Sequence, residues 1–318
     1  MITNPTVIVL GAGASIPYGY PSNVGLVKDI VQNIERLDWI TIIDALGINR
    51  SGLNLLRSEL LLSQTHSMDA FLEHRPELLE AGKVAIALSL LSRENREVFN
   101  DLEVTDEGIY SYLFNSLTTS WEEFNQNKLT IITFNYDRSL EYYIFTALKR
   151  LFNKSNSDIA KAMLCLPIIH VHGSLGPLPW QAPGGTDYCP LFGAGITAIE
   201  MGRRIKVASQ NIAVVLQPQP KSKEFILACE RLKEAKKIYF LGFGYNADNL
   251  EMLGLSQLNI YDPLLRPKNF SSELKLYRGS ALGLEEAQIQ EIQNKWHIAL
   301  PDKKCNALDF LRGFTDLS

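Results

Sequence analysis

Residues 6–15 read T-V-I-V-L-G-A-G-A-S, and this stretch decides the fold. Its apolar run, Val7–Leu10, has three β-branched members and no polar alternation, which is typical of a strand buried on both faces of a parallel α/β sheet. Gly11 and Gly13 follow, and a helix is predicted to begin near Ser22. Glycines let the backbone approach a pyrophosphate closely, and a helix N-terminus offers free N–H groups to the same anion. The stretch therefore predicts a dinucleotide-binding strand–loop–helix unit.

The full dehydrogenase fingerprint is incomplete. It requires a third glycine where this chain has Ile16, and an acidic residue about 20 positions further on, at the end of the next strand. Asp29 and Glu35 lie instead in what we interpret as a continuing helix. An ordinary NAD dehydrogenase is therefore disfavoured, and an ordinary tight strand-to-helix turn is the alternative interpretation.

Composition limits the classes of function. The chain has 318 residues, of which 46% are hydrophobic, enough for one large or two moderate domains. Its net charge of −4 gives no indication of direct nucleic-acid binding. No stretch is long and apolar enough to span a membrane, and the first apolar run is too short for a signal peptide. We therefore expect a cytoplasmic protein with no membrane partner.

The four cysteines do not form a metal-binding pattern. They are widely spaced and no two form C-x-x-C, so we expect no zinc and no other metal site. Reduced structural thiols are the default for an intracellular chain.

Further strands and helices complete an α/β pattern. Strands are predicted at 129–134, 167–173 and 237–241, a weak one near 212–216, and final ones at 258–261 and 275–277. Helices are predicted at 139–152, 222–235, 246–253 and 285–296. Strands that alternate with helices predict a Rossmann-like, doubly wound parallel sheet.

A helical segment interrupts this pattern. Between residues 37 and 124 the leucines recur at helical spacing, for example Leu53, Leu56 and Leu60, and no strand is evident. We therefore predict a helical insertion at 36–125 within a sheet domain formed by 1–35 and 126–318. The leucine stripes fit a buried core, and a subunit interface is the alternative for part of them.

Polar residues follow several of the predicted strands at their carboxyl ends, where open α/β sheets bind ligands. Asn135 and Asp137 follow one strand, with helix capping as the alternative interpretation. His172 ends the next and suits a general base near neutral pH, although a lone histidine is more often structural. His170 and His172 are expected to share one face, but no third metal ligand lies nearby. The Pro- and Gly-rich segment 174–195 suits a lid or a substrate wall.

Four motifs, in this order and on these elements, resemble the sirtuin superfamily: G-A-G-A-S at 11–15, T-F-N-Y-D at 133–137, H-G-S at 172–174 and G-F-G at 242–244. The resemblance covers 1–35 and about 126–262. Classical sirtuin deacylases carry a four-cysteine zinc module and a Pro-Asp-Phe-Arg segment. This chain lacks the former and has P-Y-G-Y at 17–20, so deacylation is disfavoured. It looks more like the sirtuin-like domains of bacterial anti-phage systems.

The resemblance implies an activity and a set of roles. Members of that group hydrolyse NAD+ to nicotinamide and ADP-ribose, often as homo-oligomers and in some systems with a HerA-type ATPase partner. NAD+ would be the substrate, with Asn135 positioning water and ribose hydroxyls and His172 acting as the base. The cofactor-binding residues would be Gly11, Ala12, Gly13, Ser15, Asp137, Gly242 and Gly244, with Asp137 holding the nicotinamide amide.

The sequence therefore favours an NAD+ glycohydrolase. A non-catalytic module that binds NAD or ADP-ribose is the first alternative. The enzyme is favoured over it because Asn135 and His172 are both present, whereas a binding module needs neither. A deacylase, a DNA-processing activity and another Rossmann-like function are further alternatives, although the chain has neither an acidic metal cluster nor a basic stripe.

Overall fold

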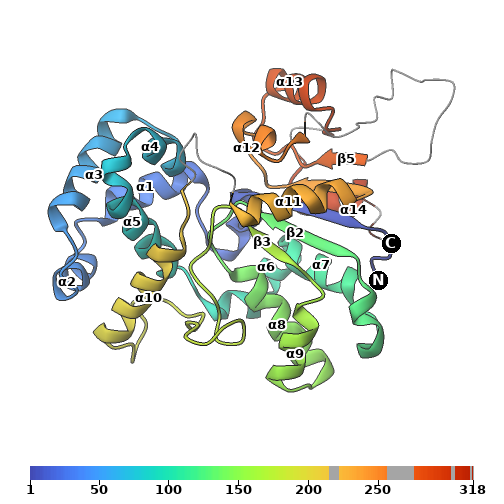
Figure 1. The fold of residues 1–318 in the computed structure, drawn as a ribbon, viewed down its shortest axis with the longest axis horizontal. Helices are drawn as coiled ribbons and strands as arrows, with labels where there is room; N and C mark the ends of the chain where they lie inside the picture. Colours follow the sequence, from blue (N-terminus) through green and yellow to red (C-terminus); the bar gives the residue numbers. More distant parts are fainter. Residues whose placement is uncertain (215–221, 256–275, 302–304, 316, 318) are drawn as a thin grey trace.

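The computed structural model describes residues 1–214, 222–255, 276–301, 305–315 and 317. Its centre is an all-parallel five-stranded sheet in the order β3-β2-β1-β4-β5 (Figure 1). The strands are β1 (Thr6–Leu10), β2 (Leu129–Thr133), β3 (Ile168–His170), β4 (Lys237–Leu241) and β5 (Leu276–Gly279). The α/β class is therefore confirmed, and the strand order is consistent with the Rossmann-like arrangement predicted.

The predicted central strands are confirmed, and they pair in parallel. Ile8 of β1 pairs with Ile131 of β2 on one side and Tyr239 of β4 on the other, and all three are buried. β3 is shorter than predicted, because the chain turns after His170 and the Gly173 N–H donates to the His170 carbonyl over 3.2 Å. Near the weak strand predicted at 212–216, Ile212 forms a single antiparallel bridge to Gly173. The strand predicted at 258–261 lies outside the described residues.

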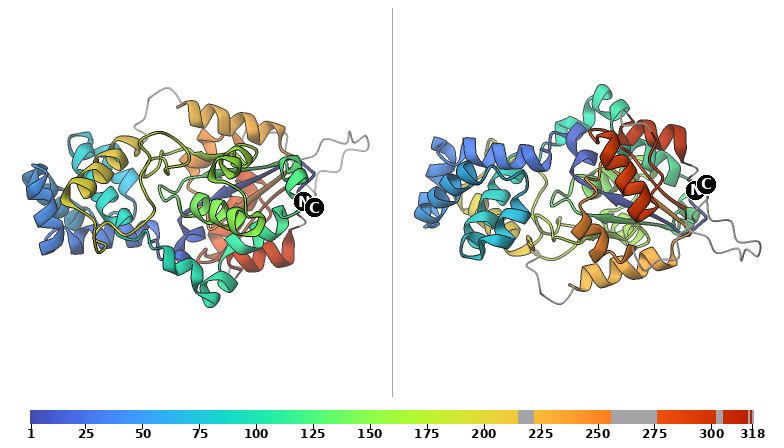
Figure 2. Two further views of the ribbon diagram at one scale, coloured as in Figure 1. Left: turned by 90° about the horizontal axis from the view of Figure 1, so that it is seen from below. Right: turned by 90° about the horizontal axis from the view of Figure 1, so that it is seen from above.

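Helices cover both faces of the sheet (Figure 2). On one face, the core of Ile8 and Ile131 includes residues of α7 (Ile109–Leu117), α8 (Ser139–Phe152) and α14 (Ala307–Phe314). On the other, Val7 and Val9 pack in a second core with α11 (Lys223–Glu234) and α13 (Glu286–Trp296). This burial on both faces explains why the strand sequences do not alternate.

A further group of helices forms a block beside the carboxyl edge of the sheet (Figure 1). It contains α1 (Asn23–Asn33), α2 (Leu37–Ala45), α3 (Arg50–Ser63), α4 (Met68–His74) and α5 (Leu79–Leu91). The N-cap predicted for α1 is confirmed, because the Ser22 hydroxyl accepts from the Gly25 N–H over 3.1 Å. α10 (Ala198–Asn211), a helix not predicted, also packs on α5 and α2. Three shorter helices complete the main elements: α6 (Leu102–Glu107), α9 (Asn156–Met163) and α12 (Ala247–Met252).

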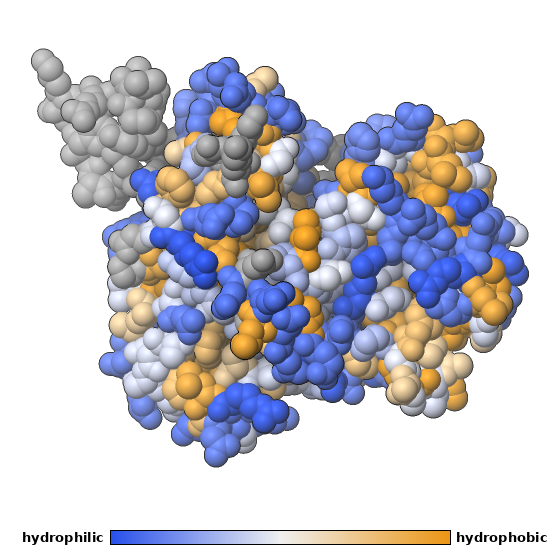
Figure 3. Space-filling model, turned by 180° about the vertical axis from the view of Figure 1, so that it is seen from behind, coloured by the Kyte–Doolittle hydropathy of each residue, from blue (hydrophilic) through white to orange (hydrophobic). Residues whose placement is uncertain are grey.

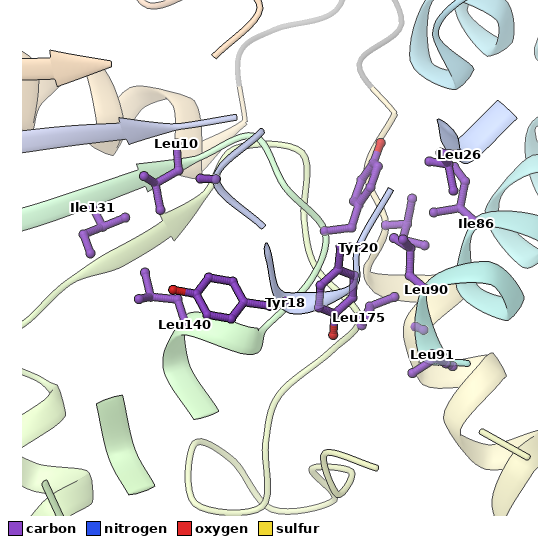
Figure 4. Packing of buried hydrophobic residues seen from close by; sticks show 14 of the residues in the cluster. Leu10, Tyr18, Tyr20, Leu26, Ile86, Leu90, Leu91, Ile131, Leu140 and Leu175 are labelled. Carbon is purple, nitrogen blue, oxygen red and sulfur yellow. The ribbon is translucent and has the colours of Figure 1, made fainter. Parts of the chain in front are cut away.

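One apolar core joins the sheet to this helical block (Figure 4). Leu10 and Ile131 lie at the sheet, Tyr18 and Tyr20 in the loop after β1, and Ile86 in α5, all in the same cluster of buried side chains. The segment after β1 also forms two single-turn 3₁₀ helices before α1, η1 (Ala12–Ala14) and η2 (Ile16–Tyr18). No helix in the described part of the chain is long and apolar enough to cross a membrane.

Candidate functional site

A cavity of about 190 Å³ lies at the carboxyl ends of β1, β2, β3 and β4. In a parallel sheet of this strand order, chain connections leave β1 and β4 toward opposite faces, and ligands bind at that point. The molecular surface is indented beside it, between the helical block and the part of the molecule that carries α12 (Figure 3). The cavity is lined by Gly11, Ala12, Asn23, Ser67, Asp69, Ala70, Glu73, Phe134, Asn135, His172, Phe243, Gly244, Asn246, Asp248, Asn249 and Met252.

The two glycine loops predicted to hold the cofactor pack against each other. The Gly11 N–H donates to the Leu241 carbonyl over 3.1 Å, and the Gly13 N–H donates to the Gly242 carbonyl over 2.9 Å. Gly242 has a φ of +57°, and a Cβ there would collide with the Ala14 backbone nitrogen. Gly11 and Gly244 line the cavity, whereas Gly13 and Gly242 do not. The N–H groups of Gly11 and Gly13 are thus already used, which differs from the pyrophosphate role expected of them.

Asn135 follows β2 and is held firmly at the cavity wall. Its Nδ2 donates to the Gly11 carbonyl and to the Ser15 hydroxyl, each over 3.0 Å, and its own carbonyl contacts His170 Nδ1 at 2.8 Å. Within the described residues no donor bonds to Asn135 Oδ1. The side chain therefore presents one fixed acceptor to the cavity.

His172 lies across the same cavity. Only 5% of its surface is exposed, and neither ring nitrogen has a hydrogen-bond partner among the described residues. Its ring packs against Phe134 and Phe225, with centroid distances of 5.2 Å and 5.9 Å. Burial lowers the pKa of His172 below its ordinary value of 6.5, and the Asp69 carboxylate opposes that shift. The imidazole is therefore neutral at pH 7 and free to accept a proton.

The backbone after His172 is fixed by a glycine. Gly173 has a φ of +73°, and a Cβ there would collide with the Asn211 carbonyl at the end of α10. The His172 carbonyl accepts from the Ala213 N–H over 2.8 Å. The conformation of the turn at His172 and Gly173 is thus fixed by contacts with the C-terminal end of α10 and the residues after it.

Asp69 is a site residue that sequence reasoning missed. It lies in α4 of the helical block, where it accepts a hydrogen bond from the Tyr136 hydroxyl, and its Oδ2 lies 3.9 Å from His172 Nδ1. Glu73 of α4 and Asp248 of α12 add two more carboxylates, and no lysine or arginine is among the described lining residues. The cavity is therefore acidic, which no local motif indicates.

Asp137 and Ser15, two other predicted site residues, lie behind the cavity wall. The Asp137 carboxylate accepts hydrogen bonds from the Ser139 hydroxyl and from the Ser139 N–H, the latter over 3.2 Å. Burial raises the pKa of Asp137, although hydrogen bonds from Ser139 and Ser15 oppose that shift. Neither Asp137 nor Ser15 lines the cavity. Asp137 thus bonds to the first residue of α8 without being its N-cap, which is Arg138, and Ser15 accepts a hydrogen bond from Asn135.

The expectation that His170 and His172 share a face is wrong, because the strand ends at His170. His170 Nε2 contacts the Glu141 carboxylate of α8 at 2.5 Å, whereas the His172 ring packs against Phe134 and Phe225. Burial opposes a charge on His170, but Glu141 and the Asn135 carbonyl outweigh it, so its pKa is raised. No group of three or more His, Cys, Asp or Glu side chains in the described segments is arranged to hold a metal ion.

The 174–195 loop is not a wall of the cavity, since none of its residues is among the lining residues described. It is instead fixed to the interior by buried charges. Arg138 donates to the carbonyls of Pro177 and Asp187, each over 3.0 Å, while Glu94 binds Arg138 and also Arg204 of α10. The loop is thus held against the helical block rather than placed over the site.

Comparisons of the chain with protein-family models, with curated proteins and with solved structures found no match.

Proposed function

We propose that the chain is an NAD+ glycohydrolase, which converts NAD+ and water to nicotinamide, ADP-ribose and a proton. The observation that carries this proposal is His172, a buried neutral imidazole without a hydrogen-bond partner in the described structure, in one small cavity with the fixed amide of Asn135. Both follow strands of an all-parallel sheet, at the edge where such sheets bind ligands. The four sequence motifs provide the second, independent support.

In this proposal His172 is the general base. Water attacks C1′ of the nicotinamide ribose, and its proton passes to an imidazole nitrogen. Because Asp69 lies 3.9 Å from His172 Nδ1, its carboxylate stabilises the imidazolium that results. Asn135 Oδ1 accepts a hydrogen bond from the attacking water or from a ribose hydroxyl.

The leaving group needs no acid. When the C1′–N bond breaks, its electron pair neutralises the positive pyridinium ring, and nicotinamide departs without a proton. The step therefore requires only that water be oriented and deprotonated while positive charge on the ribose is stabilised. The carboxylates of Asp69, Glu73 and Asp248 supply negative charge around the cavity.

The same carboxylates indicate which end of NAD+ enters. The nicotinamide ring is cationic and the pyrophosphate is anionic, so an acidic cavity favours the ring and repels the phosphates. Pockets that enclose a whole drug-sized ligand measure about 300–1,000 Å³, and this one measures about 190 Å³. The nicotinamide end therefore occupies the cavity, and the rest of the dinucleotide lies outside it.

The motif resemblance extends the proposal to a biological setting. It supports an NAD-depleting effector of a bacterial anti-phage system that works as a homo-oligomer, with a HerA-type ATPase as a partner.

Nicotinamide release by the purified full chain, alone and with a HerA-type ATPase, tests the proposal. Asn135→Ala and His172→Ala should each lower turnover by about 10²- to 10⁴-fold, whereas His66→Ala, at an exposed histidine that is not among the lining residues, should not change it. NAD+ affinity, measured by calorimetry, should survive in His172→Ala. Binding without turnover under both conditions would refute the enzyme and support a binding module. Neither binding nor turnover would refute both.

A further inference from the structure

A second and larger cavity lies on another part of the molecule. It measures about 910 Å³ and is bounded by α8 and α9, by Arg96 and by segments 178–180 and 187–188 of the 174–195 loop. The helices α8 and α9 lie next to each other (Figure 1). None of its lining residues belongs to the acidic cavity. Its volume lies within the range of pockets that enclose a small organic ligand.

Two stacked aromatic pairs form the apolar part of its wall. Tyr142 stacks on Tyr188 with ring centroids 4.5 Å apart, and Phe145 stacks on Trp180 at 4.6 Å. Tyr142 and Trp180 are the partly exposed members of these pairs. The Trp180 Nε1–H has no hydrogen-bond partner in the part of the chain that the structure describes. Planar rings of this kind bind the faces of other planar rings.

The polar part of the wall is cationic. Lys149 and Arg150 lie exposed in the last turn of α8, where positive charge is favourable in any helix. Arg96 approaches from a separate segment, with its guanidinium 5.9 Å from the Tyr142 ring, so cations from two elements converge on one cavity. The only acidic lining residue described is Asp187, 3.9 Å from Arg96.

We propose that this cavity binds a nucleotide, with its base on the exposed rings and its phosphates on the three cations. Aromatic faces alone would suit an apolar ligand, and cations alone would suit any anion. Both together, in an indented cavity of small-ligand size, suit a molecule that carries a planar base and phosphates. The charge of this cavity is opposite to that of the acidic cavity, which repels phosphate groups. The nucleotide-site proposal does not rest on the NAD+ glycohydrolase proposal.

A bound nucleotide would contact Arg96 and Tyr188, which are joined by hydrogen bonds to the loop after β1. The Arg96 Nε donates to the Tyr188 carbonyl over 2.5 Å, and the hydroxyls of Tyr188 and Tyr20 are 2.9 Å apart. Tyr20 lies in the loop between β1 and α1. The ligand would therefore contact the same 174–195 loop that Arg138 holds through the carbonyls of Pro177 and Asp187.

Calorimetric titration of the full chain with ATP tests the proposal. ATP should bind with 1:1 stoichiometry at this cavity, and an Arg96→Ala, Lys149→Ala, Arg150→Ala triple variant should weaken binding by at least about tenfold. Trp180→Ala should weaken it by about 5- to 150-fold, the usual effect of losing a base-stacking ring. Trp180→Phe should retain binding but abolish the quenching of tryptophan fluorescence by ATP.

Control variants locate the site. Lys161→Ala removes an exposed cation of α9 that does not line the cavity, and Asn135→Ala alters the acidic cavity, so both should bind ATP as the wild type does. Equal binding of inorganic pyrophosphate and ATP would overturn the proposal, because it would show an anion patch that ignores the base. Absence of ATP binding at millimolar concentration, or binding lost in Asn135→Ala, would overturn it as well.

Discussion

Glu94 holds together the most deeply buried charges of the molecule, so replacing it by glutamine should destabilise the fold strongly. Its Oε1 accepts from Arg138 Nε over 2.6 Å, and its Oε2 accepts from Arg138 Nη2 over 3.0 Å and from Arg204 Nη2 over 2.8 Å. Exposure is 0% for Glu94 and 1% for each arginine. Glu94→Gln would keep the shape but leave two buried cations without a counter-charge and turn an amide N–H₂ toward arginine donors.

The expected size of the effect follows from this burial. Breaking a buried ion pair by removing one partner costs about 3–5 kcal/mol, out of a total of about 5–15 kcal/mol for a folded protein. With a urea m-value of about 3 kcal/mol/M, the unfolding midpoint should fall by about 1 M or more. Because Arg138 also holds the carbonyls of Gly176, Pro177 and Asp187, the 174–195 loop should lose order in the same variant.

Urea unfolding of wild type and variant, followed by circular dichroism, measures this loss. Glu234→Gln is the matched control, because its partner Arg231 lies 2.8 Å away but both side chains are exposed, by 63% and 40%. The control should change the free energy of unfolding by no more than about 1 kcal/mol. An unchanged midpoint for Glu94→Gln, with an unchanged m-value, would refute the claim that this charge cluster stabilises the fold.

Further predictions concern the turn and the histidines. Gly173→Ala should destabilise the fold and lower NAD+ turnover more than Gly184→Ala does, measured by urea unfolding and nicotinamide release. Gly173 and Gly184 both have positive φ, so an alanine at either position is strained by about 1–2 kcal/mol, but only at Gly173 would the added Cβ meet a backbone carbonyl. Equal effects of the two substitutions would contradict this. Histidine NMR titration should give His172 a pKa below 6.5 and His170 one above it; the reverse order would contradict the described contacts. His172 then contributes stability that is lost as pH falls below 6.5, and His170 contributes stability that is lost as pH rises through its own pKa.

The parallel strands could be predicted because their burial is evident in the local sequence of each strand. Val7–Leu10 is a continuous apolar run, and Leu129–Thr133 combines three apolar residues with two threonines and no charged residue. Strands that are buried on both faces of a parallel sheet have such sequences. Asn135 and His172 could be predicted as cavity residues for the same reason, since the carboxyl ends of parallel strands lie along one edge. The early end of β3 could not be predicted, because the turn after His170 is closed by a backbone hydrogen bond and the apolar pattern of the sequence does not record such bonds.

The acidic character of the cavity could not be predicted. Asp69 and Glu73 lie in α4 and Asp248 lies in α12, and only tertiary packing brings these helices to the strand ends. Asp137 is predicted as a cofactor-binding residue from its place in the T-F-N-Y-D motif. Its carboxylate instead accepts a hydrogen bond from Ser139 at the start of α8 and does not line the cavity. Gly13 is a position of close backbone approach, as the sequence predicts, but the group that lies against it is the backbone of Gly242.

The pH dependence of kcat/KM for NAD+ cleavage tests the central claim most directly, namely that neutral His172 is the base. Activity should fall on the acid side with a midpoint below 6.5, because protonation removes the acceptor and burial lowers the pKa of His172. In Asp69→Asn the midpoint should move to still lower pH, because the carboxylate that raises this pKa is gone. An acid limb that stays in place in Asp69→Asn, or NAD+ cleavage that persists in His172→Ala, would contradict the account.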